Sequence, residues 1–145
     1  MAQIKCVCIS TQRKTSAKNI HQCQAASDGL AGDIHQGWGE RQVSMLPMDC
    51  VQDYFSTQGN PIEYGHFGEN LVIDGLDWET LSEGQLLSAG TVKLQIIRIG
   101  AGGPKSDAYH GKKVCAPMEG FFVFCKILQG GTLQEGMEIV KEDRK

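Results

Sequence analysis

A cysteine close to several cationic side chains is the clearest candidate for chemistry in this sequence. Cys115 follows His110, Lys112 and Lys113 within five residues. Neighbouring positive charge favours the thiolate, which is the form that acts as nucleophile and as metal ligand. The segment therefore predicts a reactive thiol. A lone cysteine ahead of a strand is also typical of an inert, buried thiol.

A glycine-rich loop brings a carboxylate, an imidazole and a guanidinium close together in sequence. Asp33 and His35 are two residues apart in a loop with glycines at 29, 32 and 37, and Arg41 follows the loop. In extended backbone, side chains two apart fall on one face, where they would orient a polar ligand or an oxyanion. The alternative is a strained turn in which Asp33 bonds its own backbone and His35 caps a strand.

A second polar loop, residues 65–71, places Glu69 and Asn70 at the entry of an apolar strand. These are candidate site residues, although Asn70 would equally satisfy backbone groups at a bend. Both loops carry glycines and precede apolar strands. We therefore expect residues 29–37 and 67–70 to lie side by side and to line one concavity. Residues 99–106 are not a phosphate-binding loop, because the two required glycine positions hold Ile99 and Pro104.

The elements that must position these groups are mostly short strands. Alternating or apolar runs predict strands at residues 4–10, 19–26, 41–46, 69–73, 85–88, 91–99, 120–128, 132–134 and 138–141. One helix is expected over residues 48–58, where Val51, Tyr54 and Phe55 share a face, and a short turn is expected at 78–83. With 18 glycines and many short strands, the sequence predicts a mainly β protein, more readily a compact β-barrel than a sandwich.

Length and charge limit the class of protein. The 145 residues favour a single domain over the whole chain, residues 1–145. A net charge of −3 with no basic stripe argues against nucleic-acid binding. No signal peptide or membrane-length apolar run is present, so we expect a cytoplasmic protein without a membrane partner and with six reduced cysteines.

The loops taken together resemble the MOSC domain, named after the C-terminal domain of molybdenum-cofactor sulfurase. The matching pieces follow the family order over nearly the whole chain: residues 29–37 (GLAGDIHQG), 41–44 (RQVS), 67–71 (FGENL), 75–77 (GLD), 81–84 (LSEG), the strand at 92–99, 117–120 (PMEG) and 130–136 (GGTLQEG). The opening residues 7–10 (VCIS) are similar to those of short, stand-alone bacterial members.

This resemblance implies a compact MOSC-type β-barrel with one or a few short helices. It also implies sulfur carriage on a cysteine persulfide, or binding of the molybdenum cofactor (molybdopterin) through a cysteine. The family is further associated with pyridoxal phosphate. The implied partners are a molybdenum-cofactor enzyme or a sulfur donor protein.

The site that the resemblance implies is built around Cys115, as sulfur carrier or molybdenum ligand. Lys112 and Lys113, together with His110, would lower its pKa, and Arg41 would pair with the pterin phosphate. The remaining members would shape the pocket and hydrogen-bond the pterin ring: Asp33, His35, Glu69 and Asn70. Arg41 would equally pair with a carboxylate at the rim of the barrel.

Two other classes of function stay open. One is a non-catalytic module that binds an anionic cofactor or a partner protein. It is favoured because many family members have a cysteine soon after the strand at 92–99, where this chain has Ala101, Gly102, Gly103 and Pro104. The other is a metal hydrolase built on Asp33, His35 and His66.

Overall fold

The computed structural model describes residues 2–11, 17–34, 36–37, 39, 42–99 and 122–142, with only the backbone at residue 79. Within these ranges the protein is mainly β, with one α-helix, as predicted. The elements in chain order are β1 (Gln3–Ile9), β2 (Lys18–Asn19), β3 (Gln22–Ala26), β4 (Gly29–Leu30), β5 (Val43–Pro47), α1 (Met48–Gln58), β6 (Leu71–Asp74), the 3₁₀ turn η1 (Trp78–Thr80), β7 (Leu86–Ala89), β8 (Val92–Ile99), β9 (Val123–Gln129), β10 (Gly131–Gln134) and β11 (Val140–Glu142).

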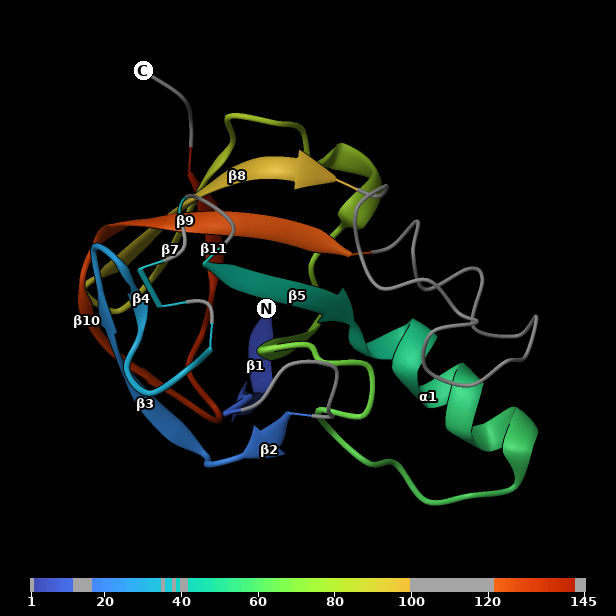
Figure 1. Ribbon diagram of the computed structural model, residues 1–145. Coiled ribbons are helices and arrows are strands. Elements are labelled where there is room, and N and C mark those ends of the chain that lie inside the picture. The colour runs from blue at the N-terminus through green and yellow to red at the C-terminus, as the bar shows by residue number, and fades with distance from the viewer. Residues whose placement is uncertain are drawn as a thin grey trace.

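Eight strands form one curled sheet in the order β11-β7-β8-β9-β5-β6-β1-β2, and β10-β3-β4 form a second, smaller sheet (Figure 1). Backbone hydrogen bonds join β1 to the chain that leads into β11: Ile4 donates to the Met137 carbonyl at 2.9 Å, and Ile139 donates to that of Ala2 at 3.0 Å. These bonds join β1, next to one end of the large sheet, to the chain at the other end. The sheet curls into a half-barrel, where the sequence predicted a compact β-barrel.

The β5 and β6 strands are the parallel pair in this sheet, with Met45 opposite Leu71. Parallel neighbours need a crossover connection, and α1 supplies it. Val51, Tyr54 and Phe55 of α1 are buried, as the helical spacing predicts. The helix ends at Gly59 in the left-handed conformation, with the Asn60 N–H bonded to the Phe55 carbonyl at 2.9 Å. Pro47, the last residue of β5, has ψ 138° and occupies the N-cap position of the helix.

The core has two parts, separated by the sheet. The larger cluster fills the barrel interior and includes Ile4 and Val7 of β1, and the smaller one packs between the sheet and α1 and includes Cys6 and Cys8. A register shift between Ile4 and Cys6 lets residues three apart face the same side. The burial of Cys6 and Cys8 in an apolar strand agrees with the sequence.

The predicted strand at residues 19–26 is wrong in one respect, because it is broken into β2 and β3 at His21. His21 has φ 70°, and its N–H donates to Asn19 Oδ1 at 3.1 Å. Asparagine side chains often bond a backbone amide two residues on and so turn the chain. The short strand β4 was not predicted, since it lies inside the glycine loop.

Candidate functional site

The loop after β4 folds back on itself through backbone and amide contacts. The Gly37 N–H donates to the Asp28 carbonyl at 2.8 Å, and the Gln36 side chain bonds both Gly32 N–H (3.1 Å) and Asp28 Oδ1 (3.3 Å). Gly29 has φ 138°, and a Cβ there would lie 3.0 Å from Gln36 Cα. Glycine is therefore needed at this point of the loop.

Asp33 fastens this loop to the end of β1. Its Oδ1 accepts the Ser10 N–H at 2.9 Å, and the Ile34 N–H donates to the Ser10 carbonyl at 2.7 Å. The side chain is 5% exposed. A buried carboxylate that accepts backbone N–H groups positions a loop as well as any capping residue.

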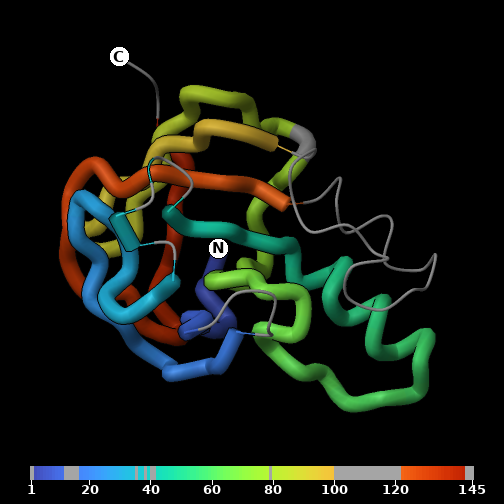
Figure 2. Tube along the Cα trace, viewed as in Figure 1, coloured from blue at the N-terminus to red at the C-terminus, as the bar shows by residue number. Residues whose placement is uncertain are grey.

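Asn70 lies at the junction of β1, β5 and the glycine loop. Its Nδ2 donates to the Cys8 carbonyl at 2.9 Å and to Asp33 Oδ1 at 3.3 Å, while its Oδ1 accepts the Ser44 N–H at 2.9 Å. Its own N–H donates to the Ser44 carbonyl at 3.0 Å. We call Asp33, Ser44 and Asn70 the polar junction. The bond from Asn70 to Asp33 confirms that the two predicted loops meet, as Figure 2 allows the reader to follow along the chain.

Glu69 holds the neighbouring loop in shape. Its two carboxylate oxygens accept the Gly65 N–H at 2.9 Å and the Phe67 N–H at 3.0 Å, and the side chain is fully buried. Burial raises the pKa of Glu69 to about 7, although these hydrogen bonds act in the opposite direction. Glu69 is therefore a buried acid close to its titration point at neutral pH.

These contacts decide what the described part of the site can do. The carboxylate of Glu69 accepts hydrogen bonds from backbone N–H groups. The side chain of Asn70 bonds the backbone of Cys8 and Ser44 and the carboxylate of Asp33. Both side chains are buried. Their arrangement fits the positioning of loops better than direct hydrogen bonds to a pterin ring.

Sequence reasoning missed Gln42 as part of this framework. Its Nε2 donates to the carbonyls of Ser27 (3.0 Å) and Gly39 (2.9 Å), and its Oε1 accepts the Ile127 N–H at 2.8 Å. Gln42 thus ties the two ends of the glycine loop to β9. The signal was an amide directly before a fully buried strand, where backbone groups need partners.

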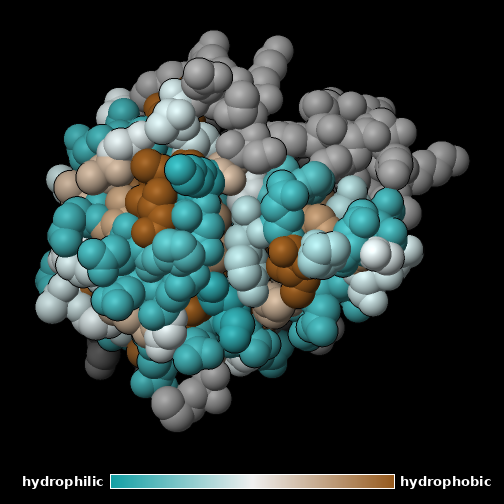
Figure 3. All heavy atoms as spheres, turned by 90° about the horizontal axis from the view of Figure 1, so that it is seen from below, coloured by the Kyte–Doolittle hydropathy of each residue, from teal (hydrophilic) through white to brown (hydrophobic). Residues whose placement is uncertain are grey.

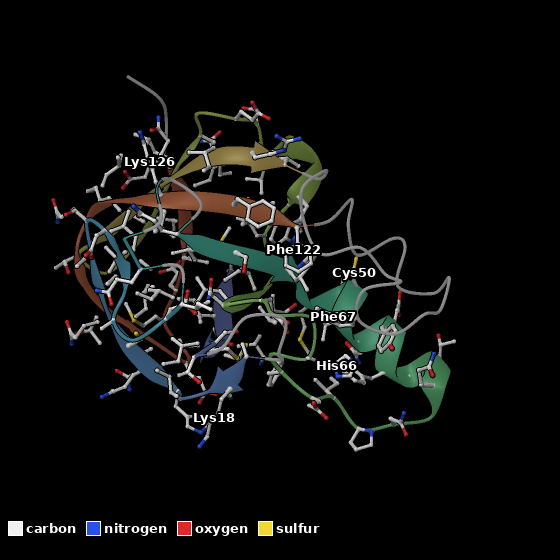
Figure 4. All side chains as sticks on the ribbon, in the orientation of Figure 1. Lys18, Cys50, His66, Phe67, Phe122 and Lys126 are labelled. Carbon is white, nitrogen blue, oxygen red and sulfur yellow. The ribbon has the colours of Figure 1, made fainter. Side chains whose placement is uncertain are left out.

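His66 does not approach the polar junction as a ligand. It packs against the rings of Tyr54, Phe55 and Phe67 at centroid distances of 5.9, 5.2 and 5.1 Å and lies 3.4 Å from Glu63 Oε2. Figure 4 shows His66 and Phe67 beside α1. Within the part of the chain that the structure describes, no three His, Cys, Asp or Glu side chains could share a metal ion. The hydrolase hypothesis gains no support from these residues.

The five described cysteines are free thiols, and the surroundings of four of them disfavour the thiolate. Burial raises the pKa of Cys23 and Cys125. A hydrogen bond to Cys8, whose Sγ lies 3.6 Å away, and burial raise that of Cys6. Burial, then the carboxylates of Asp53 and Asp49, raise the pKa of Cys50 to about 11.

The other predicted site residues lie outside the described residues: His35, Arg41, His110, Lys112, Lys113 and Cys115. The strand ends that flank the Cys115 segment are described. Ile99 at the end of β8 pairs with Val123 at the start of β9, and Val123 in turn pairs with Met45 of β5. Met45 adjoins Ser44 in the chain, so these strand ends lie next to the polar junction.

Among the described residues, no helix has the length and apolar character needed to cross a membrane.

Comparison with curated proteins gives no match. Solved structures show the same fold. The YuaD protein from Bacillus subtilis matches with a TM-score of 0.72 and 18% identity, over 96% of this chain and 94% of that one.

Two further structures extend this likeness. YiiM from Geobacillus stearothermophilus matches with a TM-score of 0.72 and 18% identity, over 99% of this chain and 76% of that one. YiiM from Escherichia coli gives 0.70 and 15%, over 99% and 71%. The family model of the MOSC domain matches residues 31–99, the part that contains the whole polar junction and Glu69. The family that this chain is similar to is therefore the MOSC domain family.

Proposed function

We propose that this protein carries sulfur on Cys115 or binds the molybdenum cofactor through it. The observation that carries the proposal is the match of residues 31–99 to the MOSC domain, a family associated with molybdenum-cofactor sulfurase-like proteins. The raised thiol pKa values of Cys6, Cys23, Cys50 and Cys125 support the choice of thiol. Four of the other five cysteines are poor nucleophiles, which leaves Cys115 with its cationic neighbours as the best candidate.

In this proposal the buried carboxylates and amides have a positioning role. Asp33, Asn70 and Glu69 fix the loops next to the strand ends from which the Cys115 segment departs. Arg41, Lys112 and Lys113 supply positive charge for a pterin phosphate, and His35 supplies a polar contact. When bound, the cofactor would contribute molybdenum, which accepts soft thiolate sulfur.

The sulfur-carrying step needs a persulfide donor. The Cys115 thiolate attacks the outer sulfur of R–S–SH, the S–S bond of the donor breaks, and R–S⁻ leaves with the electron pair. The product is Cys115–S–SH. The step needs no external oxidant, because the sulfur is transferred at the oxidation level that it already has.

Intact-protein mass spectrometry after incubation with cysteine persulfide tests this step. We expect the wild-type protein to gain the mass of one sulfur atom and Cys115→Ala to gain none, while Cys23→Ala behaves as wild type. Measurement of molybdenum in the purified wild-type and Cys115→Ala proteins tests the cofactor alternative. If Cys115→Ala retains both sulfur loading and molybdenum, Cys115 has no chemical role.

The second candidate is a module that binds an anionic cofactor or a partner protein without a covalent step. The sequence Ala101-Gly-Gly-Pro104, in place of the cysteine found in many members, favours it. In that case Cys115→Ala binds molybdopterin as the wild type does, and Arg41→Gln weakens binding.

A further inference from the structure

A cavity of about 340 Å³ lies away from the polar junction, between β1, the loop before β6 and the turn after β10. Gln3, Ile4, Lys5, Tyr64, Glu135 and Gly136 line it. Its size is at the lower end of the range of small-molecule sites, roughly 300–1,000 Å³. Figure 3 shows the molecule from the side of β2 and β3, where the surface is mainly hydrophilic with small, separate apolar patches. The side chains of Gln3, Lys5 and Glu135 in the lining favour a polar ligand.

Glu135 presents a fixed negative charge to this cavity. Asn19 Nδ2 donates to its Oε1 at 3.1 Å, and His21 Nδ1 lies 3.0 Å from its Oε2. These hydrogen bonds, that from Asn19 first, lower the pKa of Glu135. The carboxylate is therefore ionised at neutral pH.

The backbone that holds this carboxylate is strained. His21 is the one non-glycine residue with positive φ in the described ranges, and its carbonyl accepts the Glu135 N–H at 2.9 Å. Such strain persists only where surrounding contacts impose it, and it is concentrated at functional sites. Here the strained backbone at His21 fixes the position of Glu135.

Lys5 presents the opposite charge to the same cavity. Among the residues that the structure describes, its ammonium group takes part in no ion pair, with Glu135 or any other carboxylate. Two opposite charges thus line one cavity without touching each other. Tyr64 adds an aromatic ring, and burial raises the pKa of its hydroxyl, which stays a neutral donor.

We propose that this cavity binds a small zwitterion that carries both an ammonium and a carboxylate group, such as a free α-amino acid. The ligand's ammonium group pairs with Glu135, its carboxylate pairs with Lys5, and its side chain lies against Tyr64. Each charge of the ligand then meets one opposite charge, which repays the cost of taking both out of water. The site is independent of the function proposed for Cys115.

Three ligands of nearly equal shape test the contribution of each charged group. L-Phenylalanine carries both groups, phenethylamine lacks the carboxylate, and 3-phenylpropanoate lacks the amine. Titration of ¹⁵N-labelled protein, followed by two-dimensional NMR, should show saturable shifts at the amides of Gln3, Lys5 and Gly136. We expect L-phenylalanine to bind about tenfold more tightly than either analogue, which is about 1.4 kcal/mol.

Two variants, each of which removes one charge from the cavity, show which residue binds which charged group of the ligand. Lys5→Met should weaken L-phenylalanine about tenfold and leave phenethylamine unchanged, and Glu135→Gln should weaken both. Lys141→Met, on β11 and outside the cavity, is the control and should bind as the wild type does. Thermal unfolding checks that each variant folds; if Glu135→Gln does not fold, the comparison of Lys5→Met with Lys141→Met decides. Equal affinity for the three ligands, no saturable shifts at these amides, or wild-type affinity in Lys5→Met would overturn the proposal.

Discussion

Glu69 is a fully buried carboxyl group, and its burial costs the fold free energy at neutral pH. Its carboxylate is shielded from water and accepts hydrogen bonds from the backbone N–H groups of Gly65 and Phe67 instead. Its pKa of about 7 shows that these bonds do not fully offset the loss of hydration. The carboxyl group therefore links the stability of the fold to pH.

We expect Glu69 to make the protein less stable as the pH rises. The folded-state pKa of about 7 lies above the ordinary value of 4.5, so the folded state binds the proton more tightly than the unfolded state. The stability is complete below pH 4.5 and is lost as the pH rises through 7. The difference in pKa corresponds to about 3 kcal/mol.

Urea denaturation at several pH values measures this effect. The free energy of unfolding of the wild type, relative to that of Glu69→Gln, should fall by about 3 kcal/mol between pH 4.5 and 8. Glu138→Gln is the control, because Glu138 is exposed and lies in a different part of the chain. Parallel pH curves for the wild type and Glu69→Gln would show that Glu69 does not titrate in this range.

Asn70 should tolerate no change of charge. Asn70→Asp removes the amide donor to Cys8 and Asp33 and places a carboxylate 3.3 Å from that of Asp33. We expect a loss of at least about 3 kcal/mol in the free energy of unfolding, measured by urea denaturation. Asn60→Asp, at an exposed position just after α1, should change stability by less than about 0.5 kcal/mol. A small effect of Asn70→Asp would mean that the junction does not hold the loops.

At the scale of elements, two glycines with similar φ should respond very differently to alanine. Gly59, at the end of α1, has φ 71° and open space where a Cβ would lie, so Gly59→Ala should cost only about 1 kcal/mol. Gly65 has φ 86°, and its Cβ would overlap the carbonyl oxygen of Ala17. Gly65→Ala should therefore cost more than about 3 kcal/mol. Comparison of the two unfolding free energies tests this, and equal costs would contradict the close packing of the Gly65 loop on residue 17.

The sequence predicted regular elements better than the turns between them. The apolar face of α1 and its glycine stop are local signals, and residues 48–58 form the helix as expected. The break between β2 and β3 depends on the bond from the His21 N–H to Asn19 and on the long-range bonds of both residues to Glu135. Contacts over more than a hundred residues of sequence leave no periodic signal.

At the scale of the whole molecule, the sequence predicted part of the candidate site from local signals and missed the part that depends on long-range contacts. Sequence reasoning placed Asp33 and Asn70 in neighbouring loops, because both loops precede apolar strands, and the structure confirms that they meet. It did not predict that Asn70 also bonds β1 and β5, or that Gln42 joins the glycine loop to β9. Those roles depend on which strands are neighbours in the sheet, and the order of strands is not written in any one segment.

The barrel as a whole also explains why one thiol should differ from the rest. Cys6, Cys8 and Cys125 are fully buried on β1 and β9, and Cys23 is buried on β3. Cys50 on α1 is less buried, but its thiol pKa is raised to about 11. Each of these positions disfavours either access or the thiolate.

Sulfur carriage and molybdenum binding both require Cys115 to be a thiolate, so the ranking of thiol reactivity tests the central claim most directly. The protein is treated with limiting iodoacetamide at neutral pH, and the labelled sites are mapped by peptide mass spectrometry. We predict that Cys115 is labelled first and that Cys23 and Cys50 follow only at higher reagent concentration. Faster labelling of Cys23 or Cys50 than of Cys115 would contradict the account and leave the non-catalytic binding module as the better function.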